Sequence, residues 1–424
     1  MKLPVIGFVG MTHLGLVSGV SAAEKGFSLV CYDPDSLRIG DLNAHKLPVS
    51  EPKLDELVLK NKNRLSFTSN ISELHNCDVV YVAPDVATDD HGQSDLTTID
   101  SLLDAVFTAT RSETVIVVLS QVPPGFTRSK QREGRIIYYQ VETLIFGRAV
   151  ERALYPERYI VGCSDPSESL PNSLQTFLEA HECPILPMRY ESAELAKISI
   201  NMCLVASVTT ANTLAELCES IGADWSEIVP ALKLDKRIGP YSYLSPGLGI
   251  AGGNLERDLA TICNFADKYG TDAGVVRAWI ANSQHRKNWA AKTIKKILLE
   301  KNPSATIAVW GLAYKENTHS IKNSPSLATI SQLSETSLRL HDPEVPSSVV
   351  KNPKAIGCSS ALEAARGADA LMILTPWPEY RQIDIGKLIS VMRGALVIDP
   401  YAVLNYKIEE GSPLKILTLG RSFL

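Results

Sequence analysis

The stretch VIGFVGMTHLG, residues 5–15, decides the fold of the first part of this chain. VIGFV predicts a strand, Gly10 predicts a tight turn, and a helical pattern follows to about Lys25. The next apolar run, SLVCYD at residues 28–33, ends on Asp33, about 20 residues beyond the turn. A strand, a glycine turn, a helix and a second strand that ends on a carboxylate are typical of a dinucleotide-binding unit. The residues predicted to hold the dinucleotide are Gly10, Thr12, Leu14, Gly15 and Asp33.

This turn departs from the usual glycine pattern at one position. Gly10 and Gly15 hold the outer positions of G-x-G-x-x-G, but Thr12 replaces the second glycine, which lets the backbone approach a pyrophosphate. The Thr12 side chain takes up room there, although its hydroxyl can hydrogen-bond a phosphate oxygen. Asp33 favours NAD over NADP, because a carboxylate repels a 2′-phosphate. We therefore predict NAD as the cofactor.

The rest of the chain repeats this alternation of strands and helices. Apolar strands are predicted at residues 78–83 and 114–119, with a helical stretch between them, which indicates a parallel, doubly wound sheet. From about Glu191 the periodicity is helical for over thirty residues. A new strand begins at Ala305, and HDPE at residues 341–344 resembles YDPD at residues 32–35. We predict an α/β fold with two doubly wound Rossmann-like domains joined by a long central helical region, at residues 1–190, 191–300 and 301–424.

The composition excludes several classes of protein. Of the 424 residues 45% are hydrophobic and 21% are charged, and the net charge of −5 argues against a nucleic-acid surface. No signal-peptide pattern is present at the N-terminus. The most apolar helical run, residues 196–211, is interrupted by Lys197 and Asn201 and is too short to span a bilayer. The eight cysteines lack C-x-x-C spacing, which predicts reduced thiols in a cytoplasmic protein and no metal site.

A second glycine-rich stretch, SPGLGIAGGNLERD at residues 245–258, ends in polar residues that such a loop would present. Taken alone it equally fits a flexible surface loop. It resembles the active-site loop of the UDP-glucose/GDP-mannose dehydrogenase family, whose pattern reads roughly P-G-x-G-F-G-G-S-C-F-P-K-D. The matching residues are Pro246, Gly247, Gly249, Gly252 and Asp258, with Arg257 in place of the lysine. The cysteine that the family uses as a nucleophile falls on Asn254.

The resemblance covers nearly the whole chain. SQVPPGFT at residues 120–127 is similar to S-T-V-P-x-G-x-T, residues 141–149 to P-E-F-L-R-E-G-x-A, and ELAKISIN at residues 194–201 to E-L-x-K-x-x-x-N. It implies a homodimer and a nucleotide-sugar substrate, a UDP-sugar in the first place. The residues with implied catalytic roles are Glu142, Lys197, Asn201, Asn254 and Asp258. Gln121, in place of the family's threonine, is expected to contact the cofactor. The residues implied to bind substrate are Arg237, Gly249, Gly252, Lys315 and Tyr401, the last in place of an arginine.

The departures from the family pattern fall mainly on one half of its chemistry. Family members oxidise a sugar alcohol with NAD, trap the aldehyde on the cysteine, oxidise it again and hydrolyse the thioester. The amide of Asn254 cannot form that thioester. Phe146 occupies the position of the family's hydrolytic glutamate and cannot act as a base. Lys197, Asn201 and Asp258, the residues of the first oxidation, are all present. We therefore hypothesise a two-electron alcohol/aldehyde or ketone oxidoreductase.

Three alternatives stay open from the sequence. An acid-forming dehydrogenase could work through a hydrated aldehyde, with Asn254 orienting the gem-diol. A non-catalytic binding protein could keep NAD or a sugar nucleotide as a ligand, and Thr12, Gln121 and Tyr401 favour this reading modestly. The substrate could also lie outside nucleotide sugars. A substitute nucleophile is not expected, because the nearest thiol, Cys263, falls in an apolar helical run.

Overall fold

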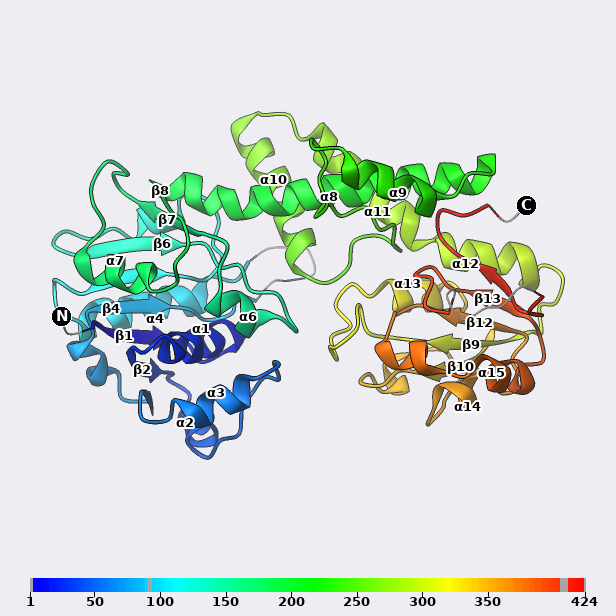
Figure 1. The fold of residues 1–424 in the computed structure, drawn as a ribbon, viewed down its shortest axis with the longest axis horizontal. Coiled ribbons are helices and arrows are strands. Elements are labelled where there is room, and N and C mark those ends of the chain that lie inside the picture. The colour runs from blue at the N-terminus through cyan, green and yellow to red at the C-terminus, as the bar shows by residue number, and fades with distance from the viewer. Residues whose placement is uncertain (1–2, 88, 90–93, 405–410, 423–424) are drawn as a thin grey trace. The chain divides into compact units, whose positions relative to one another are not determined.

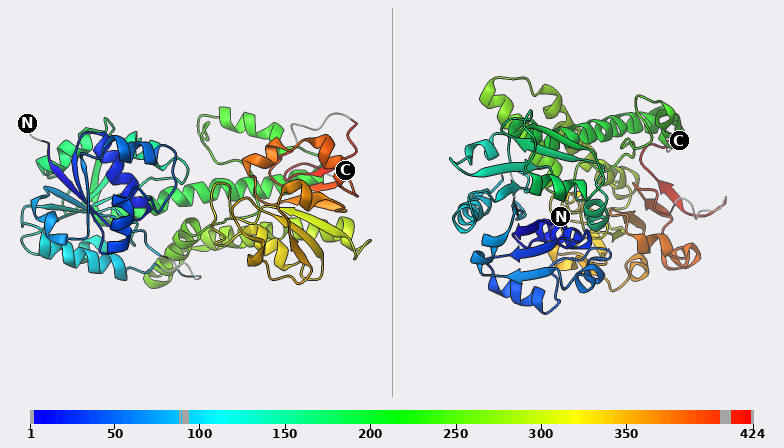
Figure 2. Two further views of the ribbon diagram at one scale, coloured as in Figure 1. Left: turned by 90° about the horizontal axis from the view of Figure 1, so that it is seen from below. Right: turned by 60° about the vertical axis from the view of Figure 1, so that its left-hand side comes forward.

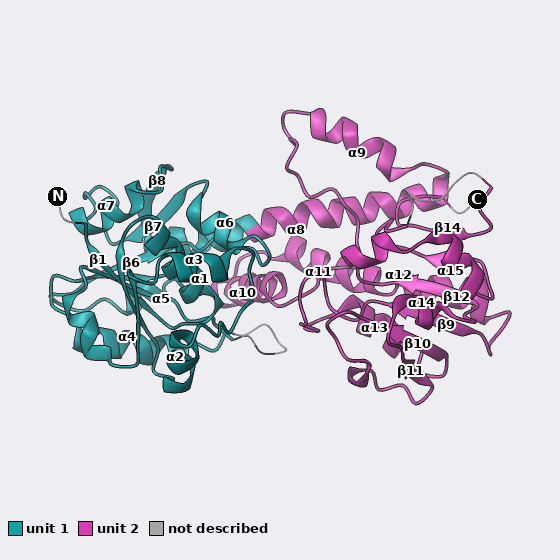
Figure 3. Cartoon of the chain, turned by 60° about the horizontal axis from the view of Figure 1, so that its bottom comes forward, with its two compact units in different colours: residues 1–200 teal, residues 201–424 magenta. Residues whose placement is uncertain are grey.

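The computed structural model describes residues 3–87, 89, 94–404 and 411–422. Its contacts divide the chain into two compact units, residues 1–200 and residues 201–424 (Figure 3). Each unit contains a sheet built largely from parallel strands, with helices on both faces (Figures 1 and 2). The predicted α/β class with two doubly wound sheets is confirmed.

Unit 1 is an eight-stranded sheet in the order β3-β2-β1-β4-β5-β6-β7-β8. Among the residues of this unit that the structure describes, β6–β7 is the one antiparallel strand pair. The strands are β1 Val5–Val9, β2 Ser28–Tyr32, β3 Leu65–Thr68, β4 Val79–Val82, β5 Val115–Val118, β6 Ile136–Gln140, β7 Tyr159–Cys163 and β8 Ile185–Arg189. The helices are α1 His13–Glu24, α2 Ser36–Asn43, α3 Leu54–Lys60, η1 Ile71–Asn76, α4 Thr97–Ala109, α5 Phe126–Ser129, α6 Ala149–Leu154 and α7 Asn172–Glu179.

The central strands of unit 1 are continuous apolar runs because both faces of the sheet are covered. Along β4, Val79 and Tyr81 pack into the core formed with α1 and α7. Val80 and Val82 point to the opposite face and pack into the core formed with α4. All four side chains are essentially inaccessible to solvent. Packing on both faces therefore fixes the position of the strand ends, where the cofactor residues lie.

One long helix, α8 Tyr190–Ile221, begins in unit 1 and continues into unit 2. With 32 residues it is longer than the apolar run that the sequence suggested, so the prediction that this run is too short to span a bilayer was wrong. In the described part of the chain it is the one helix that satisfies length and hydropathy criteria for a membrane span, and a third of its most apolar window is buried inside the protein. Core helices of soluble proteins satisfy the same criteria, so the length of α8 is weak evidence for a span.

Unit 2 begins with helices and ends with a six-stranded parallel sheet in the order β11-β10-β9-β12-β13-β14. The first group comprises α9 Trp225–Leu234, α10 Asn254–Tyr269, α11 Gly274–Lys287, α12 Trp289–Ile294 and η2 Lys295–Leu299. The strands are β9 Thr306–Trp310, β10 Ser337–His341, β11 Ala355–Gly357, β12 Ala370–Ile373, β13 Leu396–Ile398 and β14 Lys415–Leu417. Between them lie α13 Pro325–Ser331, η3 Ser347–Val349, α14 Ala361–Ala365, η4 Pro378–Gln382 and α15 Ile385–Val391.

The two sheets share a local arrangement that the repeated Asp-Pro sequence predicted. Asp33, after β2, accepts a hydrogen bond from the backbone NH of Met11 at 2.7 Å. Asp342, after β10, accepts from the backbone NH of Leu312 at 2.6 Å and of Ala313 at 3.0 Å. In both units the first strand therefore leads into a turn whose amides are held by a carboxylate from the neighbouring strand.

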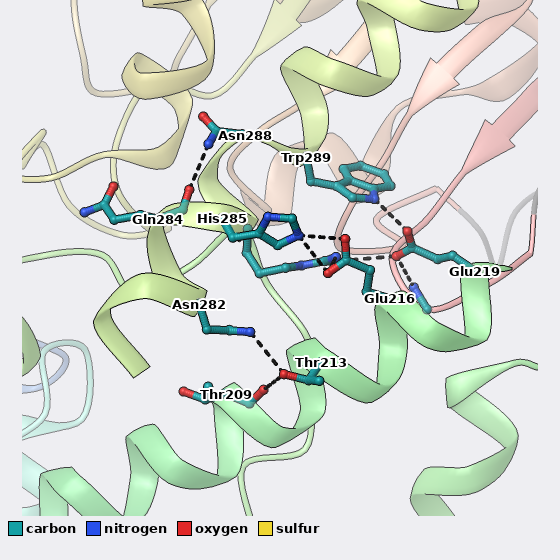
Figure 4. A network of polar contacts seen from close by, with 11 residues as sticks. Thr209, Thr213, Glu216, Glu219, Asn282, Gln284, His285, Asn288 and Trp289 are labelled. Atoms are coloured by element: carbon teal, nitrogen blue, oxygen red, sulfur yellow. Dashed lines mark hydrogen bonds and ion pairs between the residues drawn. The ribbon is translucent and has the colours of Figure 1, made fainter. Parts of the chain in front are cut away.

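A polar network joins α8 to α11, α12 and the C-terminal segment within unit 2 (Figure 4). The carboxylate of Glu219 accepts hydrogen bonds from the Trp289 indole at 2.8 Å and the Gly420 backbone NH at 3.0 Å, and it pairs with Arg286 at 3.3 Å. The Arg286 side chain is fully buried and pairs also with Glu216. Because a buried guanidinium without a counter-charge is costly, Glu219 and Glu216 fix how these helices pack.

Candidate functional site

The predicted cofactor turn has the geometry of a dinucleotide-binding unit. Gly10, at the end of β1, has φ +91°, and a Cβ there would lie 2.8 Å from the backbone nitrogen of Pro84. A Cβ on Gly15 would lie 2.0 Å from the backbone oxygen of Gly10, so α1 can start this close to β1 only with glycine at that position. Both outer glycines of the motif are therefore required by packing.

Asp33 lies beside this turn, as the spacing predicted. It is almost fully buried, and its Oδ2 accepts from the Met11 NH and from the Arg38 guanidinium at 2.8 Å. These groups fit NAD: the first-turn amides of α1 offer donors to a pyrophosphate, and Asp33 lies at the strand end where a ribose binds. The side chain of Leu14 packs into the core, so its predicted contact with the cofactor would come from its backbone amide. Gln121 is buried just after β5.

Lys197 and Glu142 come together in unit 1. Lys197 lies in the first part of α8, and its Nζ is 2.8 Å from Oε1 of Glu142, which follows β6. Oε2 of Glu142 accepts from the backbone NH of Leu144 at 2.9 Å, which orients the carboxylate. Both side chains keep only about one sixth of their surface exposed (14% and 16%), so the pair lies in a partly desolvated place. Such a pair provides a cation for an oxyanion and a carboxylate for a proton.

Glu194, on the same face of α8 as Lys197, has a different task. Its carboxylate accepts from the backbone NH groups of Gly125 at 2.6 Å and of Thr127 at 2.8 Å, where α5 begins. Burial raises the pKa of Glu194 above its usual value. Glu194 thus anchors the loop that carries Gln121.

Asn201 and Asp258 come together in unit 2. The side-chain amide of Asn201, on α8, donates to Oδ2 of Asp258, on α10, and both residues are buried. The guanidinium of the neighbouring Arg257 lies 3.3 Å from Oδ1 of Asp258. Asp258 is therefore an oriented carboxylate with a counter-charge beside it.

Asn254 is the first residue of α10 and is exposed. It precedes Asp258 by four residues, so both project from one face of the helix. The nearest thiol in sequence, Cys263, is buried in the same helix, and burial raises its pKa. Cys203 is the one exposed cysteine of the eight, all of which the structure describes. It follows Asn201 by two positions in α8, which places it about 200° around the helix from Asn201. Within the described part of unit 2, no thiol therefore replaces the family's cysteine beside Asp258.

The glycine-rich loop packs against three separate parts of unit 2. The Gly247 NH donates to Oδ1 of Asn212 on α8, and the Ile250 NH donates to Oγ of Ser283 on α11, each at 2.8 Å. Gly249 has φ +85°, and a Cβ there would lie 2.5 Å from the Ser283 backbone oxygen. Gly252 has φ +81° and lies against the ring of Tyr314. Close packing explains these glycines, while their predicted contact with substrate stays a prediction.

Two further predicted substrate residues lie at this loop and one does not. Tyr401, after β13, is hydrogen-bonded to the backbone of Leu248, and its ring reaches within 4.0 Å of a Cβ position on Gly247. Lys315 follows Tyr314, the residue that packs on Gly252. Arg237 lies on an exposed segment after α9, where its guanidinium pairs with Asp235 at 2.7 Å. Tertiary structure therefore joins Tyr401 and Lys315 to the loop and leaves Arg237 at the surface.

Sequence reasoning missed a cluster behind the cofactor turn. The buried carboxylate of Glu51 lies 2.8 Å from Nε2 of His13 and accepts from the Gly147 NH at 3.0 Å. The His13 ring stacks on Phe146 with the ring centroids 4.2 Å apart. Phe146, the replacement for the hydrolytic glutamate, is thus coupled to the first residue of α1. No local signal predicts this, because residues 13, 51 and 146 meet only in the folded chain.

The two sheets, the glycine turn and the paired polar groups define a class: an oxidoreductase built on a dinucleotide-binding sheet with a second doubly wound sheet. The comparisons agree. Residues 4–178, 191–284 and 308–406 match the NAD binding, central and UDP binding domains of the UDP-glucose/GDP-mannose dehydrogenase family. The chain is 30% identical over 415 residues to the UDP-glucose 6-dehydrogenase of Rhizobium meliloti, covering 93% of this chain and 94% of that protein. It is 29% identical over 430 residues to that of Rickettsia bellii, covering 98% and 99%.

Solved structures show the same fold. A UDP-glucose dehydrogenase from Pyrobaculum islandicum superposes with a TM-score of 0.83 at 24% identity, over 98% of both chains. A UDP-D-ManNAc dehydrogenase from Pyrococcus horikoshii gives the same TM-score at 22% identity, over 98% of this chain and 99% of that one. The chain belongs to the UDP-glucose/GDP-mannose dehydrogenase family. It is an NAD-dependent nucleotide-sugar dehydrogenase-like oxidoreductase.

Proposed function

We propose that this protein removes two electrons from a nucleotide-linked sugar, a UDP-sugar in the first place, and releases an aldehyde or ketone. The observation that carries the proposal is the exposed Asn254 at the start of α10, four residues before the oriented Asp258. Asn254 stands where the family pattern has its nucleophilic cysteine. A carboxamide does not form the covalent intermediate that a second oxidation requires.

The retained residues supply what a single oxidation needs. The Lys197 ammonium and the Asn201 amide, one turn apart on α8, donate to the oxygen as it becomes an alkoxide. Asp258, through a water molecule, accepts the hydroxyl proton. The turn after β1 and Asp33 would hold NAD, which would supply the hydride acceptor. The overall change is alcohol plus NAD⁺ to carbonyl compound plus NADH and one proton.

The second oxidation lacks two groups and not one. Phe146 stands in place of the hydrolytic glutamate, and its ring stacks on His13 instead of offering a base. The thiol in α10, Cys263, is buried with a raised pKa, so it is mostly protonated at neutral pH. Supplying only one of the two groups would therefore not restore the full reaction.

Product stoichiometry tests this proposal. The purified protein is incubated with NAD and a panel of UDP- and GDP-sugars, NADH is counted at 340 nm, and the sugar product is identified by mass spectrometry. One NADH per sugar and a carbonyl product support the proposal. Two NADH per sugar and a carboxylate contradict it and support the route through a hydrated aldehyde.

A binding protein without catalysis is the second candidate, and it is favoured by Tyr401. This residue occupies the place of an arginine and packs against Gly247 in the glycine-rich loop. Calorimetric binding of a sugar nucleotide without any NADH formation across the panel would support this candidate and reject the oxidoreductase.

We propose in addition that the protein is a cytoplasmic homodimer with the domain limits 1–190, 191–300 and 301–424. The ranges of the three family matches support these limits. The exposed residues Leu214, Leu217 and Ile221 form an apolar stripe with helical spacing on α8, which supports a helix-mediated dimer. Light scattering of Leu217→Glu, which is expected to be monomeric, tests it. A dimeric variant would contradict this choice of interface.

A further inference from the structure

A carboxylate of this chain lies at the N-terminus of α1. The backbone NH of His13, the first residue of α1, donates to Oδ2 of Asp85 at 3.0 Å. The first amides of a helix have no partner within the helix, and their combined dipole attracts an anion. In a dinucleotide-binding unit that anion is the pyrophosphate of the cofactor. Asp85 therefore uses a donor that the pyrophosphate needs.

The backbone around Asp85 holds it in this place. The Asp85 NH donates to Oγ1 of Thr12 at 2.8 Å. Pro84 packs so closely on the turn that a Cβ on Gly10 would collide with it, and the Ser120 hydroxyl donates to the Pro84 backbone oxygen. Thr12 is the residue that replaces the second glycine of the motif. The replacement of the second glycine by Thr12 therefore helps to hold Asp85 at the N-terminus of α1.

We propose that Asp85 is a built-in competitor of the NAD pyrophosphate and sets the affinity for the cofactor. The Asp85 carboxylate and the pyrophosphate are both negatively charged and bind the same N-terminus of α1, so they cannot occupy it together. The cofactor binds only when the Asp85 side chain turns away from the N-terminus of α1. When the carboxylate returns to that position, it promotes release of the cofactor. The exposure of Asp85 gives the side chain room to turn. This inference rests on NAD as the cofactor and is independent of the number of electrons transferred.

A purely structural role predicts the opposite behaviour. If Asp85 served only as a cap for α1, its removal would lower stability and leave NAD affinity unchanged or reduced. Competition predicts that removing the charge strengthens binding. The sign of the change in affinity therefore separates the two roles.

The test measures the dissociation constants of NAD and of ADP-ribose by isothermal titration calorimetry on the full chain, so that no turnover is involved. The key variant is Asp85→Asn, which keeps an oxygen that can accept from His13 but removes the charge. The matched control is Asp95→Asn, in the same β4–α4 connection, because Asp95 accepts at 3.0 Å from the NH of Thr97, the first residue of α4. Thr12→Ala, alone and combined with Asp85→Asn, removes the hydroxyl that holds the Asp85 backbone.

We expect Asp85→Asn to bind both ligands about tenfold more tightly than the wild type, with Asp95→Asn unchanged. Thr12→Ala is expected to strengthen binding by less, and the double variant is expected to gain no more than Asp85→Asn alone, because both changes release one contact. A wild type that shows no binding beside an Asp85→Asn that binds also supports the proposal. Equal or weaker binding by Asp85→Asn overturns it, as does an equal gain in Asp95→Asn. If Asp85→Asn fails to fold, Asp85→Ser, which also removes the charge, decides: tighter binding supports the proposal, and unchanged or weaker binding overturns it.

Discussion

Nζ of Lys197 lies 2.8 Å from Oε1 of Glu142, and both side chains are largely shielded from water. Lys197 comes from the first part of α8 and Glu142 from the segment after β6, 55 positions apart in the sequence. Coulomb attraction between these partly desolvated partners fixes where the ammonium group of Lys197 lies. A cation held in this way needs little reorganisation when negative charge develops on a substrate oxygen.

Lys197→Met is expected to lower kcat by about 10²–10³-fold, since it removes one preorganised donor to the developing alkoxide. Affinity for NAD, measured by calorimetry, should stay unchanged, because the predicted cofactor residues lie on other elements. Lys60, an exposed lysine that pairs with Glu24, gives the matched control Lys60→Met, for which no loss of kcat is expected. A Lys197→Met protein with wild-type kcat would show that this ammonium group does not take part.

Asn254→Cys is expected to create an enzyme that forms a sugar thioester but does not hydrolyse it. The new thiol at the start of α10 can trap the aldehyde and permit a second oxidation, but no base replaces Phe146 for hydrolysis. A burst of NADH and a sugar thioester on the introduced cysteine, seen as a mass increase of the intact protein, are the expected signs. Asn254→Ser is the control of matched size and should give neither.

Combining Asn254→Cys with Phe146→Glu is expected to restore steady formation of acid with two NADH per sugar. The double variant tests whether Asn254 and Phe146 together account for the loss of the second oxidation and of thioester hydrolysis. A persistent thioester in the double variant would mean that the stacking partner of Phe146, His13, or another change prevents hydrolysis.

Glu219→Ala is expected to reduce the free energy of unfolding of unit 2 by roughly 3–5 kcal/mol, because it leaves the buried Arg286 with one counter-charge fewer. All five tryptophans lie beyond residue 200, so urea unfolding followed by tryptophan fluorescence reports on unit 2. The control is Glu335→Ala, which removes an exposed partner of Lys354 and should leave the transition unchanged. Equal effects of the two variants would contradict a special role for the network in Figure 4.

His181→Phe is expected to reduce the loss of stability of unit 1 in acid. Burial between Tyr159 and Phe177 lowers the pKa of His181 to about 4, below its usual value of 6.5. Between pH 6.5 and pH 4, His181 is therefore protonated in the unfolded chain but not in the folded chain. The free energy of unfolding falls as the pH drops through this range. The difference amounts to roughly 2 kcal/mol between pH 7 and pH 5. Urea unfolding by circular dichroism at both pH values, compared between variant and wild type, measures it. An unchanged pH dependence would contradict the lowered pKa.

Much of the fold could be predicted because its signals are local. The spacing from Gly10 to Asp33, the apolar strands and the repeated Asp-Pro sequence depend on residues close together in the chain, and the structure confirms the two sheets that they predict. The helical periodicity from about Glu191 predicted α8, which has 32 residues. Lys197 and Asn201 interrupt its apolar run but not the helix. Their polar groups find partners in Glu142 and Asp258, so the helix continues through them.

The sequence by itself determined the order of strands and helices, the cofactor turn and the absence of a cysteine at position 254. Each of these features depends only on residues that are close together in the chain. Only the tertiary structure decided that Glu194 holds a loop, that Tyr401 packs on Gly247, and that Asp85 meets the first amide of α1. Such contacts join residues more than 60 positions apart. Hydrogen bonds and van der Waals contacts act over a few ångströms, so the chain must fold before these residues can meet.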